Sequence, residues 1–342
     1  MKKTLSLILF LIAFIINMNA QTSAYNKLYD KIHIDGELAW DYLTADTMHN
    51  RLFVANSTQV HVIDTKINKK IGTIPNTKGV HGIALAYDLN KGYTSNGSDT
   101  SVTIFNLTTL STIKKIKVTG AKPDVIIYDH FSHKVFTFNG TGKNATVINA
   151  NVDTVLATIA LNGKPEGATT DNNGNVYVNV NDSNIIKVIS STSHLVTKRY
   201  ALGTGTGPMA LAIDVVNHRL FSTCSNNIMA VVNYDDGSFI TSVAISSSID
   251  GIAYDYNLNR IYCSSGSGLM NVIQENTLNF LVPIENTITQ AGAGTIAVNP
   301  VTHHIYLSCA EYEPPRKLTP KNMRLHPSPR PSSFTILDFL PY

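Results

Sequence analysis

The sequence lacks the short motifs of several common enzyme classes. It contains no G-x-S-x-G nucleophile elbow, no H-E-x-x-H zinc motif and no P-loop. Its glycine-rich GTGTG segment, at 203–207, precedes an expected strand, so no helix follows that could receive a phosphate. We therefore expect the protein to bind rather than to catalyse, with enzymatic activity as the alternative.

Cysteine is also scarce. The three cysteines, Cys224, Cys263 and Cys309, form an odd set without C-x-x-C spacing. This spacing argues against a zinc site, a thioredoxin-like redox pair and an attached haem. We expect three buried free thiols.

Neither sign of charge is in excess, with 27 basic and 24 acidic residues. Two of the basic residues, Lys2 and Lys3, precede an apolar run from Leu5 to Ile16, which is shorter than the roughly 20 residues that span a bilayer. We expect residues 1–20 to be a cleaved secretory signal, an uncleaved anchor being the alternative. The mature chain would then be periplasmic or secreted, nearly neutral and without a transmembrane segment.

What the sequence does have is a repeat of 40 to 44 residues. Each repeat contains a short segment centred on an aromatic residue and followed by further alternating segments, for example QVHVID and KKIGTI. This alternation and the Asn/Gly/Asp turns indicate antiparallel strands, and four strands at this period predict propeller blades. The aromatic-centred segments are RLFVAN (51–56), KGYTSN (91–96), KVFTFN (134–139), NVYVNV (175–180), RLFSTC (219–224), RIYCSS (260–265) and HIYLSC (304–309).

The seventh repeat is one strand short. It supplies strands near 295–298, at 304–309 and at 333–339, and we expect segment 27–34 to pair with 333–339 and close the ring without a free edge. The predicted fold class is therefore all-β, a seven-bladed β-propeller of four-stranded antiparallel blades. We expect one domain over residues 21–342, and a monomer.

Strands such as RLFVAN followed by VHVIDT resemble the YVTN-repeat family of extracytoplasmic propellers, which includes the YncE-like proteins. The resemblance covers nearly all of residues 25–342, and the segment from Glu311 through PRPSSFTILDF resembles the ending of YncE-like chains. The resemblance implies the propeller fold. Single-stranded DNA binding and cell-surface roles have been associated with the family, but a shared fold does not fix a function.

One residue at the start of each first strand should point to one mouth of the central channel, and we call these the lead residues. Four carboxylates and one imidazole among seven positions are a local excess of acid, which suits Ca²⁺ or Mg²⁺, or Mn²⁺ or Zn²⁺ with the imidazole. We expect a divalent-cation site of Asp41, Asp124, Glu166 and Asp250. The alternative is that these side chains bond backbone amides and line a water-filled mouth. The lead residues are Asp41, His81, Asp124, Glu166, Met209, Asp250 and Gly294.

Second strands should end at the same mouth, and several end in Asn, at Asn56, Asn96 and Asn139. Asn at such a position is expected to cap a turn by bonding its own backbone. Trp40, beside Asp41, would either stack on a ligand or pack between blades.

A proline-rich basic insertion, residues 311–332, interrupts the last repeat. Such a segment tends to be extended and cannot form a core, so we expect it to lie over the mouth. There it would serve as a lid, as a nucleic-acid contact or as charge compensation. Its basic residues are Arg316, Lys317, Lys321, Arg324 and Arg330.

Three functions fit these expectations. The first is an exported binding module for a small molecule, a protein or single-stranded nucleic acid. The second is a lactonase- or lyase-like enzyme that holds a cation on the four acids and uses His81 as general base. The third is single-stranded nucleic-acid binding, which requires a basic groove with exposed aromatics. The expected ligand-binding residues are Trp40, Asp41, His81, Asp124, Glu166, Asp250, Arg316 and Lys317.

Overall fold

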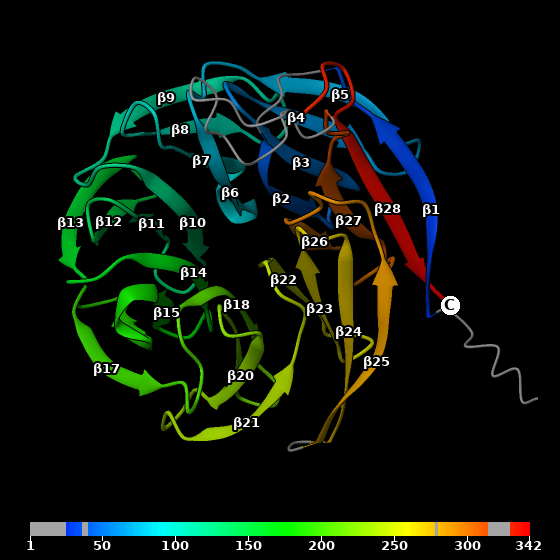
Figure 1. Cartoon of the computed structure of the whole chain (residues 1–342). Coiled ribbons are helices and arrows are strands. Elements are labelled where there is room, and N and C mark those ends of the chain that lie inside the picture. Colours follow the sequence, from blue (N-terminus) through cyan, green and yellow to red (C-terminus); the bar gives the residue numbers. More distant parts are fainter. Residues whose placement is uncertain (1–24, 36–39, 278–279, 314–328) are drawn as a thin grey trace, which may run out of the picture.

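A computed structural model of the chain describes residues 25–35, 40–277, 280–313 and 329–342. These residues form seven four-stranded antiparallel sheets, arranged as blades around a central opening (Figure 1). The seven-bladed propeller predicted from the repeats is confirmed. The expected signal, residues 1–20, lies outside the described residues. Within the described part of the chain, no helix is long and apolar enough to cross a membrane.

Each blade contains its strands in chain order from the channel outward, except the last. Blade 1 has β2 (Trp40–Asp46), β3 (Arg51–Asn56), β4 (Gln59–Asp64) and β5 (Lys69–Ile74); blade 2 has β6 (Val80–Ala86), β7 (Lys91–Asn96), β8 (Ser101–Asn106) and β9 (Thr112–Lys117); blade 3 has β10 (Pro123–Asp129), β11 (Lys134–Asn139), β12 (Asn144–Asn149) and β13 (Thr154–Ala160); blade 4 has β14 (Pro165–Thr170), β15 (Asn175–Val180), β16 (Ile185–Ser190) and β17 (Val196–Ala201). Blade 5 has β18 (Pro208–Asp214), β19 (Arg219–Cys224), β20 (Ile228–Asn233) and β21 (Phe239–Ala244); blade 6 has β22 (Ile249–Asp255), β23 (Arg260–Ser265), β24 (Leu269–Thr277) and β25 (Phe280–Ile288); blade 7 has β26 (Ile296–Val298), β27 (Ile305–Cys309), β28 (Thr335–Pro341) and β1 (Asn26–His33).

The core lies between the blades. Neighbouring blades pack face to face, so the second and third strands bury both of their faces, as β3 does along its whole length. The aromatic residue at the centre of each second strand packs into the next interface. Phe53 of blade 1 lies 5.8 Å from Phe105 of blade 2, between ring centroids, in one buried cluster. Burial of such a side chain contributes roughly 2–3 kcal/mol, which explains why the aromatic recurs in every repeat.

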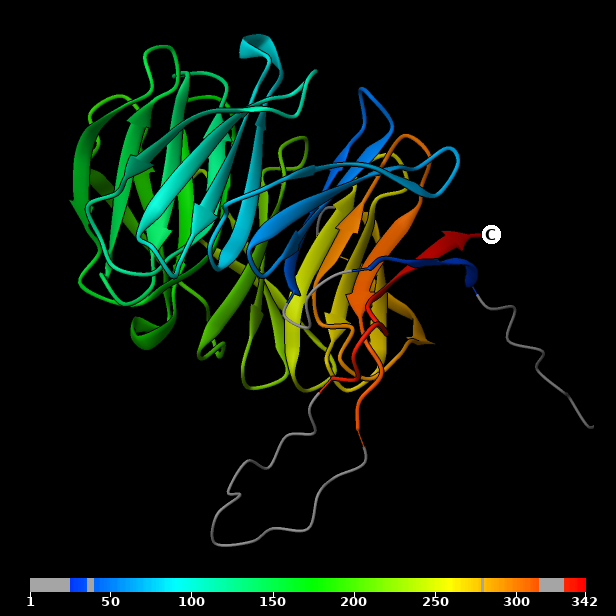
Figure 2. The same ribbon diagram turned by 90° about the horizontal axis from the view of Figure 1, so that it is seen from above.

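The ring is closed by the first and last strands of the described chain. β1 pairs antiparallel with β28, with Ile32 opposite Ile336, and becomes the outer strand of blade 7. Figures 1 and 2 show the two strands side by side in both views. The expected closure by segment 27–34 is confirmed.

The three cysteines are buried free thiols, as expected. Burial raises the pKa of the Cys224 thiol to about 11 and that of Cys309 to about 12. All three thiols are therefore protected from reaction in the folded chain.

For Asn96 and Asn139, at the ends of two second strands, the expected cap through their own backbone is wrong. The side-chain amide of Asn96 donates to the hydroxyls of Ser101 (3.0 Å) and Thr103 (2.9 Å) on the third strand. Asn139 donates in the same way to Thr146 (3.0 Å). Because hydroxyl side chains face these amides across the strand pair, the amides join the second strand to the third.

Candidate binding site at the channel mouth

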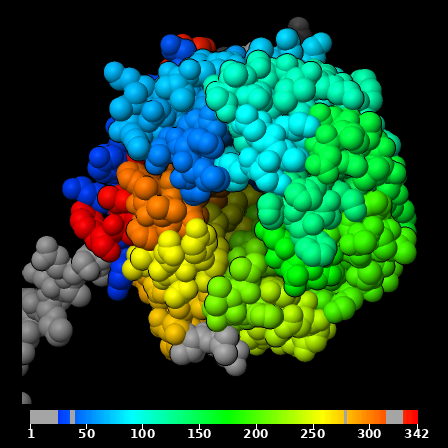
Figure 3. Space-filling view, turned by 180° about the vertical axis from the view of Figure 1, so that it is seen from behind, coloured from blue at the N-terminus to red at the C-terminus, as the bar shows by residue number. Residues whose placement is uncertain are grey.

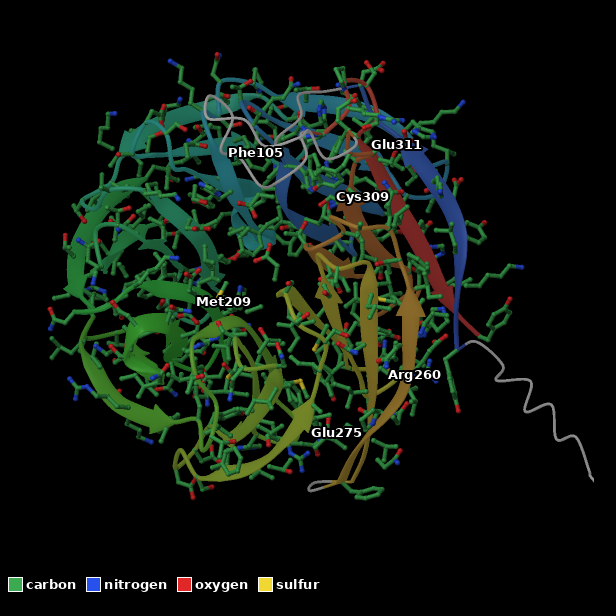
Figure 4. The ribbon with its side chains drawn as sticks, in the orientation of Figure 1. Phe105, Met209, Arg260, Glu275, Cys309 and Glu311 are labelled. Carbon is green, nitrogen blue, oxygen red and sulfur yellow. The ribbon has the colours of Figure 1, made fainter. Side chains whose placement is uncertain are left out.

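The lead residues lie where the sequence predicts. Six of them are the second residues of the first strands β2, β6, β10, β14, β18 and β22, and Gly294 lies just before β26. The first strands run in the same sense in every blade, so these residues surround one mouth of the channel. Met209 of blade 5 lies beside the central opening (Figure 4). From the opposite side, the surface of the ring is hollowed at its centre (Figure 3).

Three lead residues from consecutive blades come together. The Nδ1 atom of His81 is hydrogen-bonded to Oδ2 of Asp41, and it lies 4.0 Å from Oδ1 of Asp124. One ligand atom from each of the three side chains lies within 4.8 Å of the other two. The ring of His81 fits because its neighbour is Gly97, where a Cβ atom would stand 2.6 Å from Nε2 of His81. We call Asp41, His81 and Asp124 the mouth cluster.

Glu166 and Asp250 are not part of the mouth cluster. Within the described residues, the group that could share one cation contains neither of them. Glu166 forms an ion pair with Lys164, which stands two residues before it. The structure thus brings together two of the four carboxylates expected to bind a metal, and adds His81 to them.

Burial and mutual repulsion set the charges of the mouth cluster. Burial raises the pKa of Asp41, and the charge of Asp250 adds to this, while the hydrogen bond to His81 acts against it. Burial likewise raises the pKa of Asp124. For His81, burial lowers the pKa, but the hydrogen bond to Asp41 and the charge of Asp124 outweigh it, so the pKa is raised. The mouth is therefore a poorly solvated acidic site that favours positive charge.

Lysines near the lead residues partly balance this acid, and sequence reasoning missed them. Lys122 and Lys164 stand two residues before Asp124 and Glu166, and their charges lower the pKa of Asp124 against the effect of burial. The sequence could have indicated these lysines, because each stands two residues before an acidic lead residue.

The side chain of Tyr42 occupies part of the channel beside the mouth. Tyr42 follows Asp41 and reaches across the channel to the apolar cluster between blades 3 and 4. The cavity beside it measures about 80 Å³ and is lined mainly by small side chains, such as Gly167, Ala210 and Gly251. Burial raises the pKa of Tyr42 well above its usual range, so its hydroxyl stays neutral. A ligand larger than a few atoms would therefore stay at the mouth.

A larger groove lies between blades 1 and 2 at the same mouth. It has a volume of about 440 Å³, and Trp40, Asp41, Lys78, Val80 and His81 are among the residues that line it. Two members of the mouth cluster thus form part of its wall. The predicted ligand-binding residues Trp40, Asp41 and His81 are brought together here.

Trp40 lines the groove and also packs against neighbouring aromatic residues. Its ring lies 5.4 Å from the ring of Phe334 and 6.5 Å from that of Tyr312, between centroids. Tyr312 forms a β-bridge with Pro329. The base of the insertion therefore lies beside the groove.

Most of the insertion lies outside the described residues, including Arg316, Lys317, Lys321 and Arg324. The described basic residue is Arg330, whose Nη1 forms an ion pair with Glu311 (3.0 Å) and whose Nε lies 3.7 Å from Glu313. At its base, the positive charge of the insertion is balanced by its own acids.

No protein-family profile and no curated protein matches the sequence. Among solved structures, the chain is similar to "Crystal structure of RRP9 WD40 repeats", with a TM-score of 0.74 and 10% identity over 93% of this chain and 98% of that one. It is also similar to "Structure of U3-55K" (TM-score 0.73, 10% identity, 92% and 98% covered) and to "Kuenenia stuttgartiensis Hydrazine Synthase" (0.69, 14%, 80% and 94%). At these identities the likeness shows the fold alone. The resemblance to the YVTN-repeat family stays a prediction, and the chain is a seven-bladed β-propeller.

Proposed function

We propose that this protein is an exported binding module that holds a positively charged group of its ligand at the channel mouth, in the groove between blades 1 and 2. One observation carries the proposal: Asp41 and His81 of the mouth cluster form part of the wall of a groove of about 440 Å³ that is also lined by an aromatic ring, Trp40.

The size and lining of the groove define the ligand. Ligand pockets commonly measure about 300–1,000 Å³ and combine apolar walls with a few polar groups. Here Trp40 and Val80 are apolar, Asp41 is the acid, and Lys78 is a basic residue of the same wall. A basic side chain next to an apolar one, carried by a partner protein, has the complementary chemistry. The propeller fold is commonly used for protein interaction, which supports a protein partner.

A selection from displayed random peptides tests this proposal. Peptides selected on the protein should carry Lys or Arg beside an aromatic or aliphatic residue, and Asp41→Asn should weaken their binding at least tenfold. Trp40→Ala should weaken it as well. Asp236→Asn, which removes an acid from the turn between β20 and β21, is the matched control and should leave affinity unchanged. Peptides that bind Asp41→Asn as tightly as the parent protein would contradict the proposal.

Export rests on residues 1–20, and it is tested separately. The protein recovered from the extracytoplasmic fraction should begin at Gln21. An intact N-terminus at Met1 would show that the segment is not a cleaved signal.

A second candidate function is favoured by the geometry of the mouth cluster. The mouth cluster offers two carboxylates and one imidazole, with ligand atoms within 4.8 Å of one another. This mixed set suits Mn²⁺ or Zn²⁺, whereas Ca²⁺ and Mg²⁺ prefer oxygen ligands alone. A cation held there would polarise a bound carbonyl, as the lactonase- or lyase-like alternative requires. Elemental analysis after dialysis against each metal should give one equivalent per chain, and none in Asp41→Asn. Absence of bound metal in the parent protein would remove the enzymatic alternative as well.

The described part of the mouth contains Trp40 and the basic residue Lys78, but its acids oppose single-stranded nucleic-acid binding. The mouth cluster would repel phosphates, which supply most of the affinity in such complexes. The described basic residue of the insertion, Arg330, is already paired with acids.

A further inference from the structure

A second feature of the repeat lies on the face opposite the mouth, where each second strand begins. In six of the seven blades a basic residue stands there, and in blade 4 the residue is Asn175. The six basic residues are Arg51, Lys91, Lys134, Arg219, Arg260 and, directly before β27, His304.

Blade 1 shows what the basic side chain does. Nε and Nη2 of Arg51 donate to Asp46 (2.9 and 2.7 Å), and Nη1 donates to the carbonyl oxygen of Leu107 in blade 2 (2.6 Å). The guanidinium carbon lies 5.2 Å from the centroid of the Phe53 ring. The cation is thus held by a carboxylate, a carbonyl of the next blade and an aromatic face.

The same carbonyl is used in blades 2 and 3. Nζ of Lys91 donates to the carbonyl oxygen of Ala150 (2.9 Å), and Nζ of Lys134 donates to that of Ser191 (2.6 Å). Leu107, Ala150 and Ser191 each directly follow the third strand of the next blade. In blades 1 to 3 the basic side chain therefore bridges the slot between one blade and the next, whereas Arg260 and His304 pair with Gln274 and Asp338 of their own blades.

Blade 4 has the acceptors of this arrangement without its cation. Asp171 stands where Asp46 stands in blade 1, Tyr177 where Phe53 stands, and the carbonyl of Tyr234 where that of Leu107 stands. Nδ2 of Asn175 donates to Asp171 (2.7 Å), and the Tyr234 carbonyl accepts from the hydroxyl of Tyr200 (2.7 Å). A carbonyl oxygen has two lone pairs, so it can accept a second hydrogen bond.

A cavity of about 190 Å³ opens at this slot, between blades 4 and 5. Its lining residues belong to β15, β16 and β17 of blade 4, to the turn after β14, and to the turns before β19 and after β20 of blade 5; Figure 1 labels β15, β17 and β20. We call it the blade 4–5 slot, and its lining includes Asp171, Asn175, Tyr177, Tyr200, Tyr234 and Asp235.

The carboxylate of the slot is not neutralised by the protein. Among the described residues, no Lys, Arg or His nitrogen forms an ion pair with Asp171. Its hydrogen-bond donors are neutral: the backbone amides of Asn173 and Asn175, the side-chain amide of Asn175 and the hydroxyl of Tyr177 (3.2 Å). The two basic side chains of the lining, Lys198 and His218, both contact Asp235. Nδ1 of His218 pairs with its carboxylate (2.8 Å), and Nζ of Lys198 donates to its backbone carbonyl (2.6 Å).

We propose that the blade 4–5 slot is a second binding site, which takes the guanidinium or ammonium end of an organic cation. The bound group would contact Asp171, the Tyr234 carbonyl and the Tyr177 ring, the three partners that correspond to those of Arg51 in blade 1. The site is independent of the channel mouth, because it uses other blades and the opposite face.

Titration with n-butylguanidine, followed through the backbone amide resonances of residues 171–177, tests the proposal. Saturable shifts are expected, and the neutral isostere n-butylurea should produce none. Asn175→Arg should supply the missing cation from within the chain and weaken butylguanidine binding at least tenfold. It should fold, because six other blades carry a basic residue at this position. Asp171→Asn should weaken binding to a similar extent, and it keeps the test valid if Asn175→Arg does not fold.

Asp41→Asn removes an acid of the channel mouth, where butylguanidine could also bind, and it is the control that separates the two sites: the butylguanidine-induced shifts of residues 171–177 should be the same in Asp41→Asn as in the parent protein. An acetylated and amidated Gly-Arg-Gly peptide distinguishes the source of the cation. Tighter binding of the peptide than of butylguanidine indicates an arginine of a partner protein, and weaker binding indicates a free small cation. Equal binding of butylguanidine to the parent protein and to Asn175→Arg would overturn the proposal, as would equal binding of n-butylurea or the absence of saturation.

Discussion

His81 of blade 2 donates to, or shares a proton with, the carboxylate of Asp41 of blade 1 across the junction between the two blades. The pKa of His81 is raised because the hydrogen bond to Asp41 and the charge of Asp124 outweigh the lowering effect of burial. Removing the charge of Asp41 should therefore lower the pKa of His81. An NMR titration of the imidazole Hε1 resonance in Asp41→Asn measures this shift, and Asp171→Asn, on the opposite face, should leave the titration unchanged.

The sign of the associated stability follows from linkage. A histidine whose pKa is higher in the folded than in the unfolded chain stabilises the fold below pH ~6.5, and this stabilisation is lost as the pH rises through the folded-state pKa. In Asp41→Asn, the free energy of unfolding should therefore decrease less steeply as the pH rises above ~6.5. If the curve keeps its slope there, the Asp41–His81 pair does not form in solution.

The buried side chain of His61 should give the free energy of unfolding the opposite pH dependence. Its side chain is fully buried in β4, and among the described residues neither ring nitrogen has a hydrogen-bond partner. Burial and the charge of Lys70 lower its pKa to about 4. As the pH falls from ~6.5 to about 4, the unfolded chain gains a proton that the folded chain does not, so stability should fall by up to ~3 kcal/mol.

Urea denaturation at several pH values tests this prediction. His61→Leu should lose stability less steeply below pH ~6.5 than the parent protein. His130→Asn replaces an exposed histidine and is the matched control, with an unchanged slope. Identical slopes in all three proteins would show that His61 is already protonated in the fold or does not titrate differently from the unfolded chain.

Deleting residues 25–34 removes β1 and opens the ring. Ile32 and Ile34 are buried, so the loss of their burial and of the β1–β28 pairing should cost on the order of 5 kcal/mol. For a chain of this size, this corresponds to a fall in Tm of about 10 °C. The exposed edge of β28 should also promote association, visible by size-exclusion chromatography. A chain that begins at residue 25 is the control and should melt like the full protein.

The cysteines predict a simple chemical result. All three are buried, and burial raises the pKa of each thiol. Ellman's reagent should find no reactive thiol in the native protein and three after unfolding in guanidinium chloride. Reaction of any thiol in the native state would indicate local opening of the blade that contains it.

The fold could be predicted from the sequence because every blade is built from the same pattern of residues. The aromatic of each second strand fills one interface between blades, so its spacing counts the interfaces directly. The incomplete last repeat then identified 27–34 as the closing strand. The asparagine contacts could not be predicted in the same way, because hydroxyl side chains such as Ser101 and Thr103 compete with the backbone for the amide.

The site was only partly predictable for a related reason. The position of a lead residue follows from the repeat, but its partner depends on which neighbour is near enough. His81 stands between Asp41 and Asp124 in consecutive blades and contacts both, whereas Glu166 pairs with Lys164, the residue directly before its own strand. The blade 4–5 slot was visible as the Asn of NVYVNV among basic residues, yet its meaning required the observation that Arg51 bridges two blades.

The pairing of β1 with β28 also has a kinetic consequence. The two strands are separated by nearly the whole described chain, so this contact forms only after all the intervening blades are available, and contacts of such long range slow folding. Until then β28 presents an unpaired edge that another copy could occupy. The rate at which β1 pairs with β28, rather than the stability of any one blade, should determine what fraction of the chains folds without aggregating.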